Sequence, residues 1–378
     1  MVCLNKNNQP GKITGASMVE LSIIVPTYKE IDNVETVVKQ VHACLKGVAW
    51  EIIFVDDDSP DGTADHIRAI ARTDPHVRCL QRIGRRGLSS ACIEGMLSSS
   101  APYVAVMDAD LQHDETLLPA MLDILRKGDS DIVIGSRYIP GGGVGQWNKA
   151  RAWISRWATQ LSHIVLKANL ADPMSGFFMM THEAMLRCIR GNISGIGFKI
   201  LLDLFASSPQ PLRFQELPYQ FRERHAGESK LDTMVAWEYF LLLVDKLIGH
   251  TVPVRFIAFS LIGCVGVIVH LLALTLVYRT MGISFVVGQT LATLMAMTSN
   301  FFLNNVFTYR DMRLHGWGII RGWFSFILAC SLGALANVGI ATYLFELQTF
   351  WMSSAVAGVL VGAVWNYVAT AFFTWRKS

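Results

Sequence analysis

Two aspartates one residue apart, Asp108 and Asp110, are the side chains of this chain best placed to do chemistry. They follow residues 103–106, an apolar run that predicts a buried strand of a parallel sheet. Carboxylates there emerge beyond the carboxyl end of the strand, where open α/β sheets bind ligands. With Ala109 between them they can converge on one Mg²⁺ or Mn²⁺ ion, and Gln112 can add an amide oxygen. Such an ion would hold a diphosphate, although a chance acidic turn would look the same by itself.

Apolar runs and helical spacing alternate along the chain on both sides of this pair. Residues 21–26 and 51–55 are apolar and rich in β-branched side chains, which predicts two more buried strands. Residues 34–41 carry valines at helical spacing, and residues 131–137 predict a further strand. Strands alternating with helices over residues 20–140 predict an α/β fold with a doubly wound, mostly parallel sheet.

Polar side chains follow the first two of these strands. Tyr28 and Glu30 come after the first strand and offer an aromatic face and a carboxylate. Asp56 and Asp57 come after the second, where carboxylates can accept hydrogen bonds from base N–H groups or ribose hydroxyls. At one edge of one sheet, together with the Asp108 pair, these side chains would suit a nucleotide. The chain has neither a P-loop nor the Rossmann glycine pattern after its first strand.

Composition divides the chain into two parts. Hydrophobic residues make up 52% of its 378 residues, but most of the charge lies in residues 1–250, whereas residues 256–373 are largely apolar. This division predicts a soluble domain followed by a membrane domain. The net charge of +3 is small, and no basic patch for nucleic acid stands out. Residues 1–19 lack an apolar core and are expected to be a disordered tail rather than a signal peptide, which keeps the soluble part in the cytoplasm.

Four apolar segments in the second part are each long enough to cross about 30 Å of hydrocarbon. They are residues 256–278, 283–307, 323–345 and 350–373. The flanking basic residues lie mostly on one side of the segments: Arg255, Arg310, Arg313, Arg321, Arg376 and Lys377. The positive-inside rule therefore predicts a multi-pass protein with an all-α four-helix transmembrane domain, residues 251–378, and with both termini in the cytoplasm.

Two further segments are expected to be helices lying in the membrane interface. Residues 147–168 mix three tryptophans with basic side chains at helical spacing, and residues 233–250 combine aromatic residues with a leucine run. For the first segment, an ordinary amphipathic surface helix is the alternative.

The membrane part also contains a repeat. Four residues recur 66 positions later: Arg255 as Arg321, Cys264 as Cys330, Asn300 as Asn366 and Arg310 as Arg376. This predicts two helical hairpins of the same orientation, produced by duplication. Asn300 and Asn366 would lie about a turn and a half inside their helix ends, where an unpaired amide is costly. We expect hydrogen bonds between helices there; contact with a lipid headgroup or phosphate is the alternative.

Seven motifs lie along residues 20–232 of the predicted soluble domain. They are PTYKE (26–30), VDDDSPDGT (55–63), GLSSA (87–91), DADLQH (108–113), GSRY (135–138), DPMSGFF (172–178) and RHAGESK (224–230). Together they resemble the family 2 glycosyltransferases with the GT-A fold, and within them the dolichol-phosphate (polyprenyl-phosphate) mannose synthases. Two positions depart from that family: Lys29 stands where asparagine is usual, and Asp114 where proline is common. The last four helices resemble a small family of polyprenyl-linked membrane proteins.

The resemblance implies a role for each matching residue. The nucleoside of GDP-mannose would meet Pro26, Tyr28, Glu30 and Asp56, and the donor would also meet Phe54, Asp57 and Ala109. The metal would be held by Asp108, Asp110 and Gln112. The donor phosphates would meet Arg137, Arg224 and Lys230, and the lipid phosphate would meet Arg151 and Ser155. Among these, Asp110 and Arg137 are the expected catalytic residues.

The expected chemistry is displacement of a nucleoside diphosphate. A divalent metal and basic side chains would neutralise the charge growing on that leaving group. The acceptor phosphate is already ionised, so no general base is expected, and one-step displacement would invert an α-linked donor to a β-linked product. We therefore predict a metal-dependent dolichyl-phosphate β-D-mannosyltransferase that transfers mannose from GDP-mannose to a polyprenyl (dolichyl) phosphate at the cytoplasmic membrane face. The alternatives are a UDP-sugar donor such as UDP-glucose, or a lipid-linked sugar translocator whose soluble domain is inactive.

Overall fold

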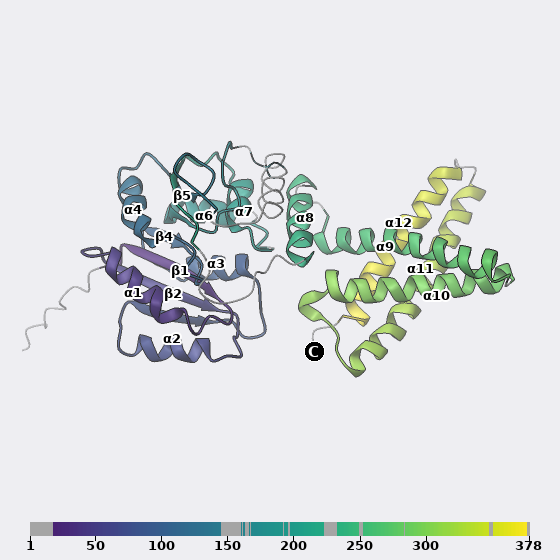
Figure 1. Cartoon of the computed structure of the whole chain (residues 1–378). Helices are drawn as coiled ribbons and strands as arrows, with labels where there is room; N and C mark the ends of the chain where they lie inside the picture. The colour runs from purple at the N-terminus through teal and green to yellow at the C-terminus, as the bar shows by residue number, and fades with distance from the viewer. Residues whose placement is uncertain are drawn as a thin grey trace, which may run out of the picture. The chain divides into compact units, whose positions relative to one another are not determined.

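The computed structural model of the chain divides into two compact units, Met1–Leu242 and Leu243–Ser378 (Figure 1). It describes residues 18–144, 160, 162, 166, 168–191, 193–195, 197–222, 233–248, 252–282, 284–347 and 351–375. Most of the predicted tail, 1–19, and most of the predicted interfacial helix, 147–168, lie outside these residues.

A seven-stranded sheet forms the centre of the first unit, in the order β3-β2-β1-β4-β6-β5-β7. The strands are β1 (Leu21–Thr27), β2 (Trp50–Asp56), β3 (Val77–Gln81), β4 (Tyr103–Val106), β5 (Ile132–Ser136), β6 (Phe178–Thr181) and β7 (Phe214–Pro218). Of these described strands, only β6 runs antiparallel to its neighbours. The predicted mostly parallel sheet is confirmed.

The strand order reverses at β1. Strands β2 and β3 extend on one side of it, whereas β4 pairs with its other side. In this register Ile24 of β1 lies opposite both Ile53 and Val106. Because parallel neighbours end at the same edge, the carboxyl ends of β2, β1 and β4 lie together, and open α/β sheets bind ligands at such a switch point.

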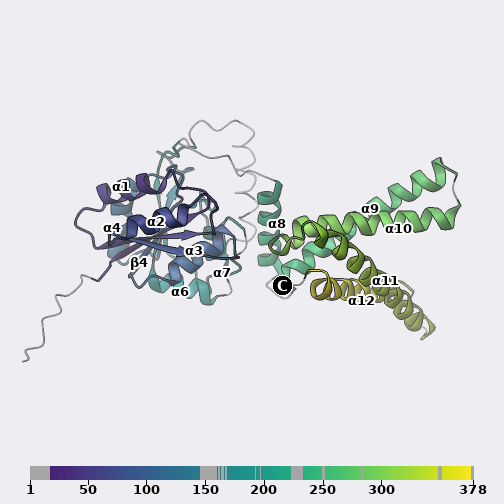
Figure 2. The ribbon, with the colours of Figure 1, turned by 90° about the horizontal axis from the view of Figure 1, so that it is seen from below.

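Helices cover both faces of the sheet. They are α1 (Val34–Cys44), α2 (Thr63–Ala71), α3 (Leu88–Leu97), α4 (Leu118–Arg126), α6 (His182–Arg190) and α7 (Ile200–Ser207), with a short 3₁₀ turn η1 (Glu115–Leu117). Val37 of α1 belongs to the core cluster that also contains Ile23. On the opposite face, Gly95 of α3 lies directly against the side chains of Ile24 and Val55. Helices α1 and α3 accordingly lie on opposite sides of the strands (Figure 2).

Three described residues other than glycine adopt a left-handed backbone: Lys29 (φ 59°), Asp58 (φ 56°) and Leu111 (φ 63°). They follow β1, β2 and β4, the three strands that end together at the switch point. A residue with a Cβ atom pays roughly 1 kcal/mol or more for this conformation. Backbone strain is therefore concentrated at the edge where the candidate site residues lie.

The second unit is helical, and α8 (Thr233–Ile248) spans the boundary between the units. Its long helices are α9 (Val254–Leu274) with a π-helical extension η2 (Thr275–Thr280), α10 (Phe285–Leu303) with η3 (Asn304–Thr308), α11 (Trp317–Glu346) and α12 (Trp351–Phe373); a 3₁₀ turn η4 (Arg310–Met312) precedes α11. The four predicted apolar segments are thus helical over most of their described residues. Helix α11 begins earlier than predicted, directly after Gly316, whose φ is 53°. Within the described residues, Val254–Tyr278 and Trp317–Leu335 are long and apolar enough to cross a membrane.

The four helices of the second unit pack as two hairpins, α9 with α10 and α11 with α12 (Figure 1). The ends of the hairpins meet at equivalent positions of the sequence repeat. The ring of Tyr309 stacks face to face on that of Trp375, with centroids 4.1 Å apart and an interplanar angle of 6°. The indole Nε1 of Trp375 also donates a hydrogen bond to Asn305 Oδ1 at 3.1 Å. The two repeats therefore contact each other through corresponding residues.

Candidate active site

The candidate site residues of the first unit gather at one edge of the sheet. Tyr28 follows β1, Asp56 ends β2, Asp108 follows β4 and Arg137 follows β5. Strand β5 runs antiparallel to β6, as does β4, so β4 and β5 point the same way and their carboxyl ends lie at the same edge. The sheet therefore brings to one edge the groups that the sequence predicted to converge.

The turn after β4 orients the second aspartate and the glutamine. Asp110 is 7% exposed, and its Oδ1 accepts the backbone N–H of Gln112 at 3.2 Å. The amide Nε2 of Gln112 donates to the carbonyl oxygen of Arg222 at 3.0 Å, and the N–H of Arg222 donates back to the Gln112 carbonyl at 3.0 Å. Because the amide nitrogen is bonded to the backbone, the amide oxygen of Gln112 is the atom suited to a metal.

His113 supports the first aspartate from within the core. Its ring is 2% exposed, and Nδ1 accepts the backbone N–H of Asp108 at 3.0 Å. A neutral ring then carries its proton on Nε2, which lies 3.7 Å from Asp108 Oδ2. The ring stacks on Phe177, with centroids 5.2 Å apart. This environment suits a residue that orients the carboxylate rather than a catalytic acid.

The side chains after β4 can be tested against the needs of a divalent metal. No group of three or more His, Cys, Asp or Glu side chains among the described residues is arranged to hold a metal. The candidate set is therefore the carboxylates of Asp108 and Asp110 with the amide oxygen of Gln112. Mg²⁺ in proteins is commonly bound through one or two carboxylates, with substrate phosphates and water completing its shell. This donor set fits a metal that shares its ligands with a diphosphate.

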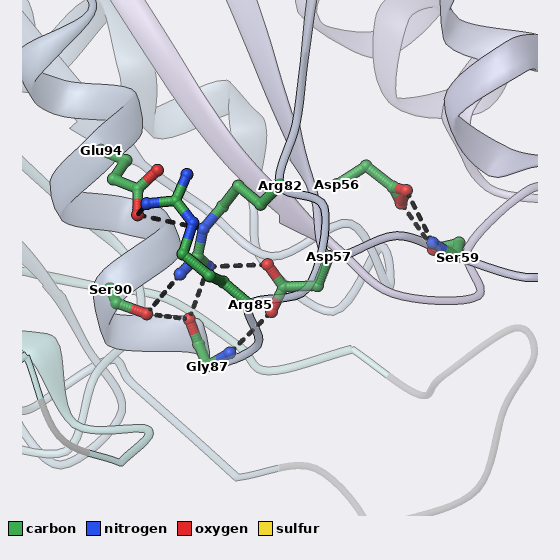
Figure 3. Close-up of polar contacts among 8 residues, drawn as sticks. All are labelled: Asp56, Asp57, Ser59, Arg82, Arg85, Gly87, Ser90 and Glu94. Atoms are coloured by element: carbon green, nitrogen blue, oxygen red, sulfur yellow. Dashed lines mark hydrogen bonds and ion pairs between the residues drawn. The ribbon is translucent and has the colours of Figure 1, made fainter. Parts of the chain in front are cut away.

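Ser59 ties the loop after β1 to the loop after β2. Its hydroxyl donates to Asp56 Oδ2 at 2.5 Å and accepts the backbone N–H of Lys29 at 3.0 Å. The N–H of Ser59 also donates to Asp56 Oδ1 at 3.0 Å (Figure 3). Next to this link, the Arg86 guanidinium lies 4.6 Å from the centre of the Tyr28 ring. The predicted nucleoside residues thus lie at the ends of two strands whose following loops are hydrogen-bonded to each other.

Asp57 is held in a buried network that the sequence did not predict. Its Oδ1 lies 2.6 Å from Arg82 Nη1, and its Oδ2 accepts the N–H of Gly87 at 2.7 Å (Figure 3). Arg82 is 2% exposed and also donates to the carbonyl of Gly87 and to Ser90 Oγ. Burial raises the pKa of Asp57, while the Gly87 N–H and Arg82 oppose that rise. The network fixes the loop before α3.

Arg137 is also paired inside the protein. Its Nε and Nη2 bond both carboxylate oxygens of Asp172. Its guanidinium carbon, Cζ, lies 5.4 Å from the centre of the Phe221 ring. Asp172 begins the DPMSGFF motif, and no role was predicted for it. Its place in the loop before β6, hydrogen-bonded to the residue that follows β5, makes it the partner that sets the orientation of Arg137.

Phe54 and Ala109, two of the predicted donor contacts, have buried side chains, and their contact with the donor stays a prediction. Phe54 points into the core of the first unit with 0% exposure, and Ala109 is 3% exposed in the same cluster. Ile52, two residues earlier on the same face of β2, belongs to the same cluster, so the Phe54 ring packs against the core. Ala109 contributes its small size to the turn between the two aspartates.

Four predicted phosphate-binding residues lie outside the described residues: Arg151, Ser155, Arg224 and Lys230. The last described residue before the predicted basic loop is Arg222. Its guanidinium bonds Glu115 at 2.7 Å and Asp114 at 2.9 Å. Asp114, the departure from the family's proline, therefore anchors the segment that leads into that loop.

Comparison with known families finds two matches. A model of glycosyl transferase family 2 matches residues 22–188, and a model of the GtrA/DPMS transmembrane domain matches residues 258–375. Together they cover both units of the chain.

Comparison with individual proteins finds relatives that share one name. The dolichol-phosphate mannosyltransferase of Pyrococcus furiosus is 32% identical over 360 residues, which cover 94% of this chain and 99% of that protein. The enzyme of the same name from Saccharomyces cerevisiae is 35% identical over 60% of this chain and 86% of its own. Among solved structures, glucosyl-3-phosphoglycerate synthase from Mycobacterium tuberculosis with Mn²⁺, UDP-glucose and phosphoglyceric acid is similar at a TM-score of 0.44 and 16% identity, over 60% of this chain and 79% of that chain.

Proposed function

The chain belongs to the family 2 glycosyltransferases, in the group that contains the dolichol-phosphate mannosyltransferases, and from that premise we propose its donor, acceptor and mechanism. It transfers mannose from GDP-mannose to a polyprenyl phosphate of the dolichyl type at the cytoplasmic face of the membrane. The reaction depends on a divalent metal and inverts the anomeric centre, which gives a β-linked lipid phosphate sugar.

One observation carries the proposal. The acidic turn at Asp108 and Asp110 lies at the same sheet edge as the Tyr28 and Asp56 loops, in a chain that matches a relative named dolichol-phosphate mannosyltransferase over 94% of its length. A nucleotide-sugar donor would require a metal site beside a nucleoside site, and the grouping of these side chains at one edge supports that assignment.

The residues after β4 prepare the donor site. Mg²⁺ or Mn²⁺ held by Asp108, Asp110 and Gln112 would neutralise the negative charge that grows on the departing diphosphate. His113 fixes the Asp108 turn, and the Gln112 N–H orients the carboxylate of Asp110. Because these groups are bonded in advance, little reorganisation is needed when the donor binds.

Basic side chains serve the two phosphates. Arg137, positioned by Asp172, is assigned to the donor phosphates together with Arg224 and Lys230. Arg151 and Ser155 are assigned to the acceptor phosphate. That phosphate is already ionised at neutral pH, so its oxygen attacks the anomeric carbon without a general base, while the bond to the diphosphate breaks and the electron pair leaves with it.

The protein is a membrane protein, and we propose four spans for it. They are the helices α9, α10, α11 and α12, which match the transmembrane family over residues 258–375. Basic residues concentrate at 310–313 and at the C-terminus, which supports cytoplasmic termini and a cytoplasmic active site.

A donor panel tests the proposal. The purified full-length chain in lipid bilayers is given a short polyprenyl phosphate and GDP-mannose, GDP-glucose or UDP-glucose, with and without chelator, and the lipid product is identified by mass spectrometry. We expect product from GDP-mannose alone, loss of activity with chelator and recovery on adding Mg²⁺ or Mn²⁺. The linkage is read from the one-bond anomeric C–H coupling, which is expected to be that of a β-mannoside.

A matched pair of variants ties the activity to the site. Asp110→Asn removes one proposed ligand and is expected to reduce the rate at least about a hundredfold. Asp123→Asn changes an aspartate that is 65% exposed and paired with Arg126, and it should leave the rate unchanged. Product from UDP-glucose but not from GDP-mannose would replace the proposed donor, and activity that survives both chelator and Asp110→Asn would refute the metal site.

A further inference from the structure

A cavity of about 310 Å³ lies among α10, α11 and α12 in the second unit. Its lining includes Asn300, Cys330, Gly333 and Asn366. Asn300 and Asn366 occupy corresponding positions of the repeat, 66 residues apart, so the cavity forms where the two hairpins face each other. The described residues around it include no charged side chain.

The two asparagine side chains lack the hydrogen bonds that we expected between helices. Both carboxamide oxygens are buried, and neither has a hydrogen-bond partner among the described residues. The nearby Asn305, in contrast, has its oxygen bonded by the Trp375 indole and by the Leu314 N–H. A buried acceptor without a partner is costly, and such a group calls for a specific explanation.

Each hairpin holds its asparagine in the same way. A Cβ atom at Gly266 of α9 would collide with the carboxamide of Asn300, and one at Gly333 of α11 would collide with Asn366 Oδ1. In both hairpins the asparagine thus packs against a glycine of the preceding helix. The duplicated arrangement fixes two carboxamides beside one cavity instead of pairing them with backbone.

The chemistry of a carboxamide limits what can occupy the cavity. The unpartnered oxygens need a hydrogen-bond donor, whereas a phosphate diester at neutral pH only accepts. An ammonium group would donate a hydrogen bond to these oxygens, but its charge would lie in an uncharged pocket without a counter-ion. A hydroxyl group both donates and accepts, so it can satisfy either edge of a carboxamide. The volume also exceeds the need of one water, whose share of liquid is about 30 Å³.

We propose that this cavity binds the hydroxyl-bearing hexose of the chain's own lipid-linked product through Asn300 and Asn366, while the anionic phosphate of that product lies outside the uncharged lining. The identity of the ligand rests on the proposed function, which supplies a sugar already attached to a lipid. Counting residues to the helix ends, Asn300 and Asn366 lie about 10 Å inside the membrane segment. A sugar bound there sits just below the headgroup level while its prenyl chain stays in the bilayer.

Lipid retention by the full-length chain tests the proposal. The protein in nanodiscs is offered synthetic polyprenyl phosphate mannose, polyprenyl phosphate without sugar, or a diacylglycerol carrying one hexose, and bound lipid is counted by native mass spectrometry. The wild type should prefer the mannosylated lipid over polyprenyl phosphate by at least about fivefold, the effect of two hydrogen bonds. The N300L/N366L double variant should lose this preference while its transferase rate is unchanged.

Matched variants separate the cavity from general changes in the helices. Thr293→Val and Ser331→Ala remove hydroxyls of α10 and α11 that bond only carbonyls of their own helices, and both should keep the preference. N300A/N366A removes the same carboxamides without adding bulk, and it should behave as the leucine pair does.

Several results would overturn the proposal. They are equal retention of the two prenyl lipids by the wild type, an undiminished preference in both double variants, or equal binding of the diacylglycerol hexoside and the prenyl product. The synthetic lipids make the test independent of catalysis. If the chain transfers no mannose, the proposed function fails. The binding measurement still tests whether the cavity binds the mannosylated lipid.

Discussion

The guanidinium of Arg137 and the carboxylate of Asp172 form a bidentate ion pair, with Nε 2.7 Å from Oδ2 and Nη2 2.8 Å from Oδ1. The Arg137 side chain is 8% exposed and that of Asp172 is 0% exposed. The backbone N–H of Arg137 donates to the same carboxylate at 3.0 Å. The pair joins the end of β5 to the loop before β6, so the proposed donor-binding charge is fixed in direction and partly neutralised before any substrate arrives.

Breaking this pair should cost stability as well as activity. Asp172→Asn leaves the buried Arg137 charge uncompensated, and we expect the free energy of unfolding to fall by about 3–5 kcal/mol. Glu20 and Arg126 form a matched bidentate pair, also at 2.8 Å, but at 30% and 41% exposure, so Glu20→Gln should cost less than about 1 kcal/mol. Urea unfolding followed by tryptophan fluorescence measures both. Similar losses in the two variants would show that burial does not strengthen the Arg137 pair.

Gly176 keeps space open for the first aspartate. A Cβ atom there would come within 3.2 Å of Asp108 Oδ2 and 3.5 Å of His113 Cε1. Gly176→Ala should therefore displace the Asp108 carboxylate by a few tenths of an ångström and lower kcat/KM about tenfold, with little change in stability. Steady-state kinetics over a range of metal concentrations measures the effect. Gly318→Ala, whose Cβ would be 3.9 Å from Leu314, is the control and should behave as wild type.

Lys29 adopts a left-handed backbone that asparagine tolerates better. This gives a physical reason for the asparagine that the family usually has at this position. Lys29→Asn should raise the free energy of unfolding by about 0.5–1 kcal/mol. Lys46→Asn is the control, because Lys46 also lies at an exposed turn but does not have a left-handed backbone. This change should not raise the free energy of unfolding. Equal gains from the two changes in denaturant unfolding would argue against backbone strain at Lys29.

The acid stability of the first unit should depend on Asp131, which lies before β5 and away from the active edge. Burial alone would raise the pKa of Asp131, but hydrogen bonds and ion pairs from Arg213 and Arg187 outweigh it and lower the pKa. Because the folded pKa lies below the unfolded value of about 3.9, this carboxylate stabilises the fold at higher pH. That contribution is lost as pH falls through the lowered pKa.

The test for Asp131 is the slope of stability against pH. Between about pH 5 and pH 2, the free energy of unfolding of Asp131→Asn should fall less steeply than that of the wild type. Transferase activity at neutral pH should be nearly unchanged. An identical slope in the variant would show that Asp131 carries no part of the acid sensitivity.

The sheet and the helices could be predicted from the sequence because their signals are local. The apolar runs at 21–26 and 51–55 became β1 and β2, and the run before Asp108 became β4. Alternation of strand and helix then required a parallel sheet, which placed Asp56 and Asp108 at one edge. The antiparallel direction of β6 has no comparable local signal, because it depends on which partner the strand meets.

The pairings inside the site could not be predicted for the same reason. Arg82 meets Asp57 across 25 positions of sequence, and Arg137 meets Asp172 across 35. A motif match also does not say which way a strand residue points, and the side chain of Phe54 lies in the core. The unpartnered oxygens of Asn300 and Asn366 also arise only from packing, since the sequence shows two similar amides and favours hydrogen bonds between them and neighbouring helices.

The left-handed turns after β1, β2 and β4 have a consequence for how this enzyme can adapt. A laboratory selection for heat tolerance alone would find easy gains at Lys29 and Asp58, because relaxing those turns removes a cost that every folded molecule carries. The same turns carry the side chains proposed to bind the nucleotide sugar. Thermal stability and catalytic rate should therefore trade against each other at this edge of the sheet more than elsewhere in the first unit.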